Sequence, residues 1–191
     1  MNAALLSSKN MCWCTPQDFF DKLNAEFGFV LDPAATDKTA KCSLYYTPET
    51  DGLSQSWDRG GAVFCNPPYG REIGKWVQKA FEEARGGGYP IVLLIPARTD
   101  TAYFHDYIYG KAEIRFVRGR LRFTDDDGNA ADPAPFPSMV VIYNGERVKE
   151  WAIKRNARFA KRSRFNGSLK NTTASPQGSE WLYPPRLFPT Q

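Results

Sequence analysis

The chain contains little of the side-chain chemistry on which metal sites and hydrolytic triads depend. Its 191 residues include one histidine, His105, and four cysteines at positions 12, 14, 42 and 65, none of them spaced as a CxxC pair. This spacing suits neither a zinc site nor a disulfide framework, and a lone histidine argues against a catalytic triad. We therefore expect no metal, reduced thiols, and His105 as an ordinary helix residue.

Long apolar runs are also missing. No stretch approaches the roughly 18 apolar residues of a membrane-spanning helix, and the first ten residues, MNAALLSSKN, lack the basic start and apolar core of a signal peptide. These absences predict a soluble, unprocessed chain in the cytoplasm, which is that of the host cell if a phage encodes it.

The charge is small in total but unevenly distributed. The net charge is +4, yet residues 154–170 hold seven Lys or Arg and no acid, which leaves 18 bases against 21 acids elsewhere. A run of this kind is either a solvated face or a contact for a polyanion such as nucleic acid. We expect a catalytic domain over residues 1–150 and a basic, proline-containing appendage over 151–191.

Apolar patterns predict alternating strands and helices. Thr15 as N-cap and Pro16 at the first helical position predict a helix that Gly28 ends, and further helices are expected over about 71–85 and 100–109. The predicted strands are FVLD (29–32), AVFCN (62–66), IVLLIP (91–96), IRFVRGRLRF (114–123) and MVVIY (139–143), with an acidic, proline-rich loop before the last. This order indicates an α/β fold of three layers with a mixed sheet.

The stretch FCNPPYG (64–70) runs an apolar strand into a stiff turn that is poor in backbone donors. The Asn66 side-chain oxygen and the Pro67 carbonyl could together accept both N–H bonds of an amino group on a planar base. Tyr69 would offer a ring on which that base stacks. The alternative is an ordinary strand-ending turn that packs a tyrosine.

Six blocks in order resemble the phage-type DNA N6-adenine methyltransferase (Dam) family: WCTP (13–16), FGFVLDPAA (27–35), DGLSQSW (51–57), VFCNPPYG (63–70), LLIPARTDTAYFH (93–105) and RGRLRF (118–123). The resemblance implies a Rossmann-like methyltransferase fold that uses S-adenosylmethionine and acts on adenine in double-stranded DNA. Restriction and modification of DNA is one setting that suits this activity, and another role for the methylation stays open.

The resemblance further implies roles for individual residues. The catalytic signature is Asn66, Pro67, Pro68 and Tyr69, and the residues implied for the cofactor are Trp13, Thr15, Pro16, Asp32, Pro33, Ala34, Ala35 and Asp51. The Asp32 carboxylate would face the positively charged methionine end of the cofactor. Their charge, and not the resemblance, leads us to expect DNA contacts from Arg71, Arg98, Arg118, Arg120, Lys154, Arg155, Arg158, Lys161, Arg162 and Arg164.

The sequence departs from the usual methyltransferase pattern after the first strand. Thr36 stands where a glycine-rich turn is usual, and Asn66 follows Asp32 by only 34 positions, too few for two complete strand–helix units. The cofactor half is therefore predicted to be abbreviated. Two alternatives stay open: methylation of another planar amino group, such as cytosine N4, an RNA base or a glutamine amide, and a catalytically inactive DNA-binding relative.

Overall fold

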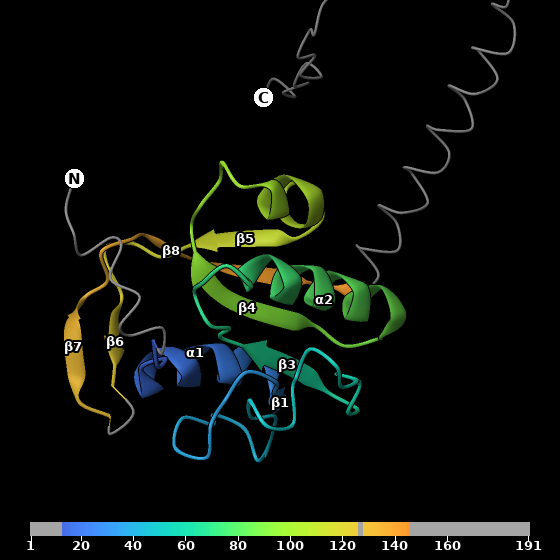
Figure 1. Cartoon of the computed structure of the whole chain (residues 1–191), viewed down its shortest axis with the longest axis horizontal. Helices are drawn as coiled ribbons and strands as arrows, with labels where there is room; N and C mark the ends of the chain where they lie inside the picture. Colours follow the sequence, from blue (N-terminus) through green and yellow to red (C-terminus); the bar gives the residue numbers. More distant parts are fainter. Residues whose placement is uncertain (1–12, 126–127, 146–191) are drawn as a thin grey trace, which may run out of the picture. The chain divides into compact units, whose positions relative to one another are not determined.

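A computed structural model of the chain describes residues 13–125 and 128–145 (Figure 1). The six basic residues of the appendage expected to contact DNA, Lys154, Arg155, Arg158, Lys161, Arg162 and Arg164, lie outside the described residues, as does the appendage itself. The predictions made for them stay predictions.

The described part of the chain contains a mixed sheet, as predicted, but this sheet has six strands where the sequence predicted five. Its strands are β1 (Phe29–Asp32), β2 (Leu44–Tyr45), β3 (Ala62–Cys65), β4 (Ile91–Pro96), β5 (Glu113–Phe116) and β8 (Ser138–Tyr143), in the order β2-β1-β3-β4-β8-β5. The four strands from β2 to β4 are parallel, whereas β8 lies antiparallel between β4 and β5. The carboxyl ends of β1, β3 and β4 therefore meet at one edge.

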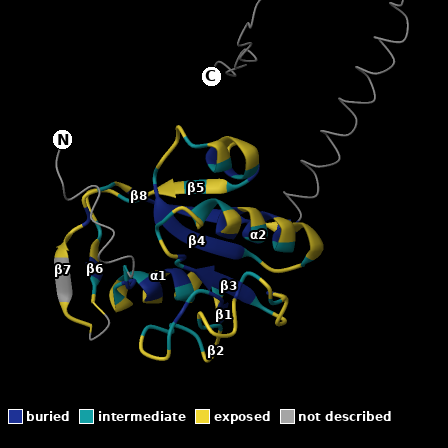
Figure 2. Cartoon of the chain, viewed as in Figure 1, coloured by how far each residue is buried: buried dark blue, intermediate teal, exposed yellow. Residues whose placement is uncertain are grey.

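The sheet is covered on both faces, so its central strands read as continuous apolar runs (Figure 2). Helix α2 (Ile73–Gly86) and the π-helical turn η2 (Phe104–Ile108) pack on one face, and helix α1 (Gln17–Phe27) packs on the other. All six residues of β4 and of β8 are buried. Full burial of one such apolar side chain stabilises the fold by about 1.5–3 kcal/mol. The buried central strands therefore form a stable support for the residues that follow the carboxyl ends of β1, β3 and β4.

Helix α1 ends as predicted but begins differently. Gly28 adopts a left-handed conformation with φ of 63°, and its N–H donates to the Asn24 carbonyl at 2.8 Å. Pro16, not Thr15, occupies the N-cap position, and no side chain caps the helix. The prediction of Thr15 as N-cap was wrong because its hydroxyl contacts Asn66 instead.

The prediction of one strand over 114–123 was also wrong, because this segment contributes to two strands that belong to different sheets. Gly119, with φ of 80°, turns the chain between β5 and strand β6 (Arg122–Thr124). Strand β6 pairs antiparallel with β7 (Ala130–Pro133), which lies in the segment expected to be a loop. Figure 1 shows this hairpin beside one end of the main sheet.

The helix predicted over 100–109 is shorter and wider than expected. Its regular part is η2, where the Tyr109 N–H donates to the Phe104 carbonyl five residues earlier at 2.7 Å. Within the described residues, no helix is long and apolar enough to cross a membrane.

Residues 33–61 join β1 to β3 with turns and the short strand β2, and contain no helix. Gly52 lies so close to the end of β1 that a Cβ added there would be 1.9 Å from the Pro33 carbonyl oxygen. The buried indole of Trp57 donates to the Gly52 carbonyl at 2.7 Å and holds this contact in place. The abbreviated connection that the spacing predicted is therefore present, and its loop is fixed against the sheet edge.

Candidate active site

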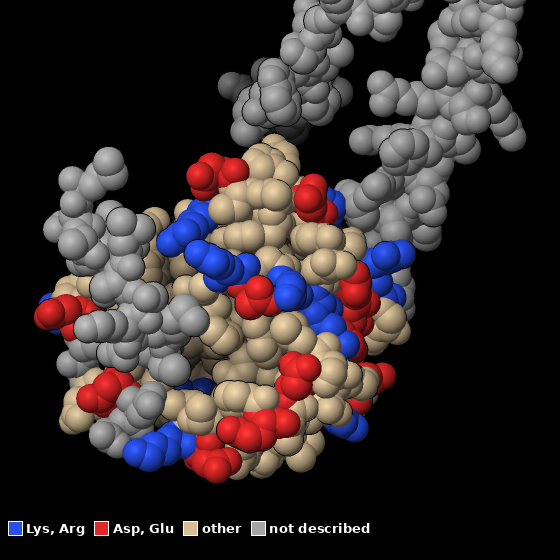
Figure 3. All heavy atoms as spheres, viewed as in Figure 1, with Lys and Arg blue, Asp and Glu red and all other residues tan. Residues whose placement is uncertain are grey.

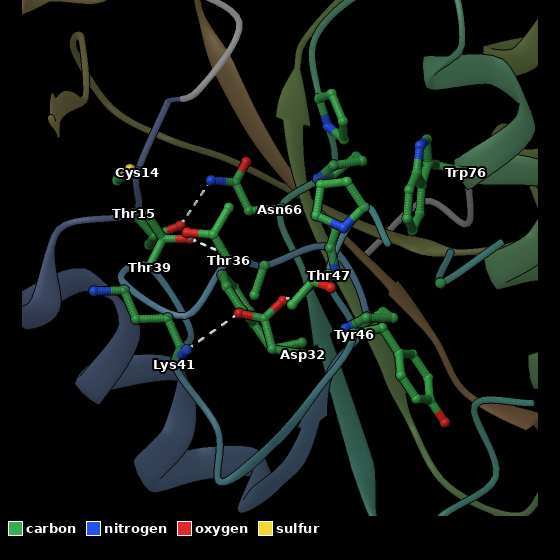
Figure 4. Close-up of a pocket in the computed structure, with 18 of the residues that line it drawn as sticks. Cys14, Thr15, Asp32, Thr36, Thr39, Lys41, Tyr46, Thr47, Asn66 and Trp76 are labelled. Carbon is green, nitrogen blue, oxygen red and sulfur yellow. Dashed lines mark hydrogen bonds between the residues drawn. The ribbon is translucent and has the colours of Figure 1, made fainter. Parts of the chain in front are cut away.

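A cavity of about 200 Å³ opens at the carboxyl ends of β1 and β3 (Figure 4). This is where open α/β sheets place their ligands. The residues lining the cavity are Trp13, Cys14, Thr15, Asp32, Pro33, Ala34, Ala35, Thr36, Thr39, Lys41, Tyr46, Thr47, Pro48, Asp51, Gly52, Phe64, Asn66, Pro67, Pro68 and Trp76. The last residue of β1 and the first residue after β3 thus face one space.

Asp32 supplies a buried carboxylate to this cavity. Its side chain is 3% exposed and accepts hydrogen bonds from the backbone N–H groups of Ala34 (3.3 Å) and Lys41 (3.2 Å). Burial raises the pKa of Asp32 to about 6, although these two N–H groups and the charge of Lys41 act in the opposite direction. The raised pKa shows that the ionised Asp32 carboxylate has lost stabilising contacts with water. A cationic ligand would stabilise the ionised carboxylate in place of that water.

Asn66 is held by one end of its side-chain amide only. Its Nδ2 donates to the Trp13 carbonyl oxygen and, at 3.0 Å, to Thr15 Oγ1. Figure 4 shows the amide nitrogen turned toward Thr15. Its Oδ1 is buried and accepts no hydrogen bond from the described part of the chain. A buried polar atom without a partner is rare, so this oxygen is an acceptor that awaits a donor.

The residues after Asn66 form the stiff turn that the sequence predicted. The Pro68 carbonyl accepts the Gly70 N–H at 3.0 Å. Tyr69 donates its hydroxyl to the Leu94 carbonyl at 3.0 Å, which ties the turn to β4. Burial raises the pKa of the Tyr69 phenol well above its usual value, so the hydroxyl remains a donor.

Aromatic rings surround the Tyr69 side of this turn. The Tyr69 ring makes edge-to-face contacts with Phe123 and Phe136, with centroids 6.0 and 5.5 Å apart. Trp13 makes the same kind of contact with both phenylalanines, at 5.4 and 5.3 Å. The hairpin of β6 and β7 thereby packs beside the Asn66 turn.

Several cavity residues were not identified from the sequence. Three threonines, Thr36, Thr39 and Thr47, line the cavity together with Lys41 and Tyr46. They lie in turns, where apolar residues do not recur at the spacing of a helix or a strand. Nothing in the sequence therefore indicates that these residues lie beside Asp32. Trp76, which we would expect as a core residue, both packs against Trp57 and lines the cavity.

Comparison with known proteins decides the family. A family model described as DNA N-6-adenine-methyltransferase (Dam) matches residues 2–165. The chain belongs to the Dam family. The resemblance inferred from the six sequence blocks is therefore confirmed.

Two phage proteins illustrate how far the similarity of this Dam-family chain extends. A DNA N-6-adenine-methyltransferase of Escherichia phage T1 is 34% identical over 119 residues, which are 61% of this chain and 48% of the phage protein. A protein of the same name from Haemophilus phage HP1 (strain HP1c1) is 26% identical over 135 residues, which are 69% of this chain and 77% of that protein. The matched region thus spans about half the length of the first relative.

The cavity of the Dam-family chain gathers most of the residues that the sequence suggested. Of the predicted catalytic and cofactor-binding residues, all but Pro16 and Tyr69 line it. Pro16 begins α1, and Tyr69 points to β4. The four described arginines expected at DNA, Arg71, Arg98, Arg118 and Arg120, are exposed and do not line the cavity. Figure 3 shows a band of basic side chains across one face, with acidic side chains above it, within it and near the lower edge.

Proposed function

We propose that this chain transfers a methyl group from S-adenosylmethionine to N6 of adenine in double-stranded DNA. The observation that carries the proposal is the Asn66 Oδ1 at the end of β3, which is buried and has no hydrogen-bond partner among the residues that the structure describes, beside a cavity that contains the Asp32 carboxylate. The mixed sheet with helices on both faces supports a three-layer, Rossmann-like methyltransferase fold. The proposed substrate would place the enzyme in the cytoplasm, which is that of the host cell for a phage enzyme.

The residues of the cavity fit the cofactor. S-adenosylmethionine supplies the methyl group when it is bound. Asp32 would hold the positively charged amino group, because this carboxylate is buried and, within the described part of the chain, accepts from two backbone N–H groups and from no cationic side chain. Trp13, Thr15, Pro33, Ala34 and Ala35 would form the walls, with Pro16 supporting them from the start of α1. Asp51, exposed at the cavity rim, would bind the ribose or the adenine.

Asn66 and Pro67 would prepare the target nitrogen. The lone pair of an adenine amino group is delocalised into the ring, which makes the nitrogen a poor nucleophile. Asn66 Oδ1 and the Pro67 carbonyl would accept its two N–H bonds, pull the nitrogen toward tetrahedral geometry and stabilise the positive charge that develops on it. Such preorganised dipoles act strongly in a site from which water is excluded. Pro68 stiffens the turn that presents both acceptors.

An adenine in duplex DNA can reach Asn66 only if it leaves the base stack, at an energetic cost of a few kcal/mol. Arg71, Arg98, Arg118 and Arg120 are exposed cations that would bind the phosphates on either side of the flipped base. The six appendage residues Lys154, Arg155, Arg158, Lys161, Arg162 and Arg164 would add contacts of the same kind.

Incubation of DNA with the protein, followed by digestion to nucleosides and mass spectrometry, tests the function directly. We expect N6-methyladenine that forms only when S-adenosylmethionine is added. N4-methylcytosine would instead support the alternative of another planar amino group. The absence of any methylated nucleoside, in DNA that the protein binds, would support an inactive relative.

Tyr69 is expected to act through its ring. Replacing Tyr69 by alanine should weaken engagement of the target base by about 1–3 kcal/mol, because the base loses a stacking surface. Tyr69→Phe keeps the ring and its contacts with Phe123 and Phe136, and loses only the hydrogen bond to Leu94. Steady-state kinetics of both variants on DNA measure the difference. A Tyr69→Phe variant as inactive as Tyr69→Ala would assign the role to the hydroxyl instead.

A further inference from the structure

The segment Trp13–Thr15 contacts the side chain on which the proposed chemistry depends. The family resemblance implied a place in the cofactor pocket for Trp13 and Thr15, and both line the cavity. Both also accept hydrogen bonds from Asn66 Nδ2, Trp13 through its backbone carbonyl and Thr15 through its hydroxyl. These contacts give the segment a task that is separate from cofactor binding.

The Trp13 carbonyl determines which way the Asn66 amide faces. The oxygen and nitrogen of an asparagine amide have nearly the same shape, so only their hydrogen-bond partners distinguish the two orientations. A backbone carbonyl can accept but not donate, and the Asn66 atom facing Trp13 must therefore be the nitrogen. Oδ1 then occupies the opposite side, where it is buried and has no hydrogen-bond partner among residues 13–125 and 128–145.

The reversed orientation would be unproductive on both sides of the amide. Asn66 Oδ1 would face the oxygen lone pairs of the Trp13 carbonyl. The Asn66 NH₂ group would face the amino group of the target base. Both groups present N–H donors, so no hydrogen bond could form between them. The Trp13 carbonyl thus selects the one orientation in which Asn66 can accept from adenine N6, and Thr15 Oγ1 stabilises that orientation by accepting from the same NH₂ group.

The two acceptors are themselves firmly held. Cys14, between them, forms a pair of backbone hydrogen bonds with Thr124 of β6, at 3.2 and 2.9 Å. The Trp13 ring packs edge-to-face on Phe123 and Phe136, and Thr15 is only 2% exposed. The hairpin therefore fixes the backbone from which both groups reach Asn66.

We propose that Thr15, together with the Trp13 carbonyl, is a positioning residue that holds the Asn66 amide with Oδ1 toward the target amino group. This inference rests on the proposed function, because it assigns Asn66 the role of acceptor for adenine N6. Thr15 acts through Asn66 and not on the substrate itself.

Thr15→Val tests the inference, since valine keeps the shape of threonine but cannot accept from Asn66 Nδ2. We expect kcat to fall about tenfold, the effect of losing one orienting hydrogen bond, with KM for DNA within about twofold of the original value. Thr15→Ser restores the hydroxyl and should return kcat to within about twofold. Because Thr15 also belongs to the proposed cofactor wall, calorimetry measures cofactor affinity in parallel. We expect that affinity to change by less than about threefold in both variants, which is less than the loss of kcat and also reports that they are folded.

A double-mutant cycle separates positioning from general damage. In an Asn66→Ala background, Thr15→Val should produce no further loss, because the amide it orients is gone. Thr124→Val is the matched control: it removes a hydroxyl that donates to the Cys14 carbonyl at 3.3 Å but does not touch Asn66, and it should change kcat less than about twofold.

Two results would overturn the inference. One is an equal loss from Thr15→Val in both backgrounds; the other is a loss explained by weaker cofactor binding. If the unaltered protein forms N6-methyladenine while Thr15→Val retains full turnover, only the positioning role fails. If the unaltered protein forms none, the proposed function fails first and the inference falls with it.

Discussion

Asn66→Ala is expected to lower the turnover of DNA methylation by about a hundredfold or more while S-adenosylmethionine still binds. The substitution removes Oδ1, the buried acceptor without a partner in the described part of the chain, and such a preorganised group acts mainly in the transition state. Single-turnover measurement of N6-methyladenine formation, paired with calorimetry of cofactor binding, tests both halves. Near-normal turnover would contradict the role assigned to Asn66.

Asn24→Ala is the matched control for this substitution. Asn24 Oδ1 accepts the Phe29 N–H at 2.8 Å, at the end of β1 opposite to Asp32. Its removal should reduce the free energy of unfolding by about 1 kcal/mol, because a partly buried N–H loses its acceptor. Turnover should not change. The pair of variants separates the loss of an asparagine hydrogen bond from the loss of the acceptor at the cavity.

Cofactor affinity is expected to fall as the pH is lowered from 7 to 5, approaching tenfold per pH unit below the pKa of Asp32, about 6. Burial raises this pKa, so below pH 6 most free protein carries a neutral Asp32. The positively charged amino group of the cofactor binds the ionised form, and binding must then release a proton. Calorimetry in two buffers of different ionisation enthalpy measures both the affinity and the proton released.

The same shift has the opposite sign for the stability of the free protein. Because the pKa of Asp32 is higher in the folded chain than its ordinary value of 3.8, its contribution to stability is present below about pH 4. That contribution is lost as the pH rises through 6, where the buried carboxyl ionises. Ionisation of Asp32 therefore lowers the stability of the free folded protein and, in the proposed function, strengthens binding of the cofactor.

Asp32→Asn should lower cofactor affinity about 10- to 150-fold at pH 7, the effect of one charge-assisted contact, and should abolish the dependence on pH. Asp37→Asn is the control within the same connection, since Asp37 is exposed and accepts from the Tyr45 hydroxyl. Its pH dependence should match that of the unaltered protein. A pH slope that persists in Asp32→Asn would assign the proton to another group.

The strands that the sequence predicted correctly are those whose signal is local. IVLLIP and MVVIY are apolar runs buried on both faces, and they appear as β4 and β8 with nearly the expected bounds. Strand β2 was missed because Leu44 is 51% exposed and only two residues pair. Strands β6 and β7 pair with each other in a short hairpin, and they were missed because the turn at Gly119 separates β6 from β5 and because β7 lies in a segment whose acidic and proline residues predict a loop.

The candidate site divides in the same way. The NPPY turn and LDPAA are contiguous motifs, so the sequence located Asn66 and Asp32 at the ends of two strands. The contact between Thr15 and Asn66 joins residues 51 positions apart, and helix-capping statistics assigned that hydroxyl to α1 instead. Thr36, Thr39 and Lys41 reach the cavity only because the connection after β1 folds back on the sheet edge.

The turns of residues 33–61 make this part of the protein modular. Two of these turns are closed by hydrogen bonds within the turn. The Thr36 N–H donates to Thr39 Oγ1 at 3.0 Å, and the Thr47 N–H donates to Thr50 Oγ1 at 2.8 Å. The fixed points are β2 and Gly52, where only a hydrogen fits beside Pro33. Because doubling the length of a loop costs only about 0.6 kcal/mol, each turn can be exchanged or lengthened between these points. The walls of the cavity formed by these turns can thus change without displacing Asn66, because the turn that carries Asn66 follows β3 and is tied to β4 through Tyr69.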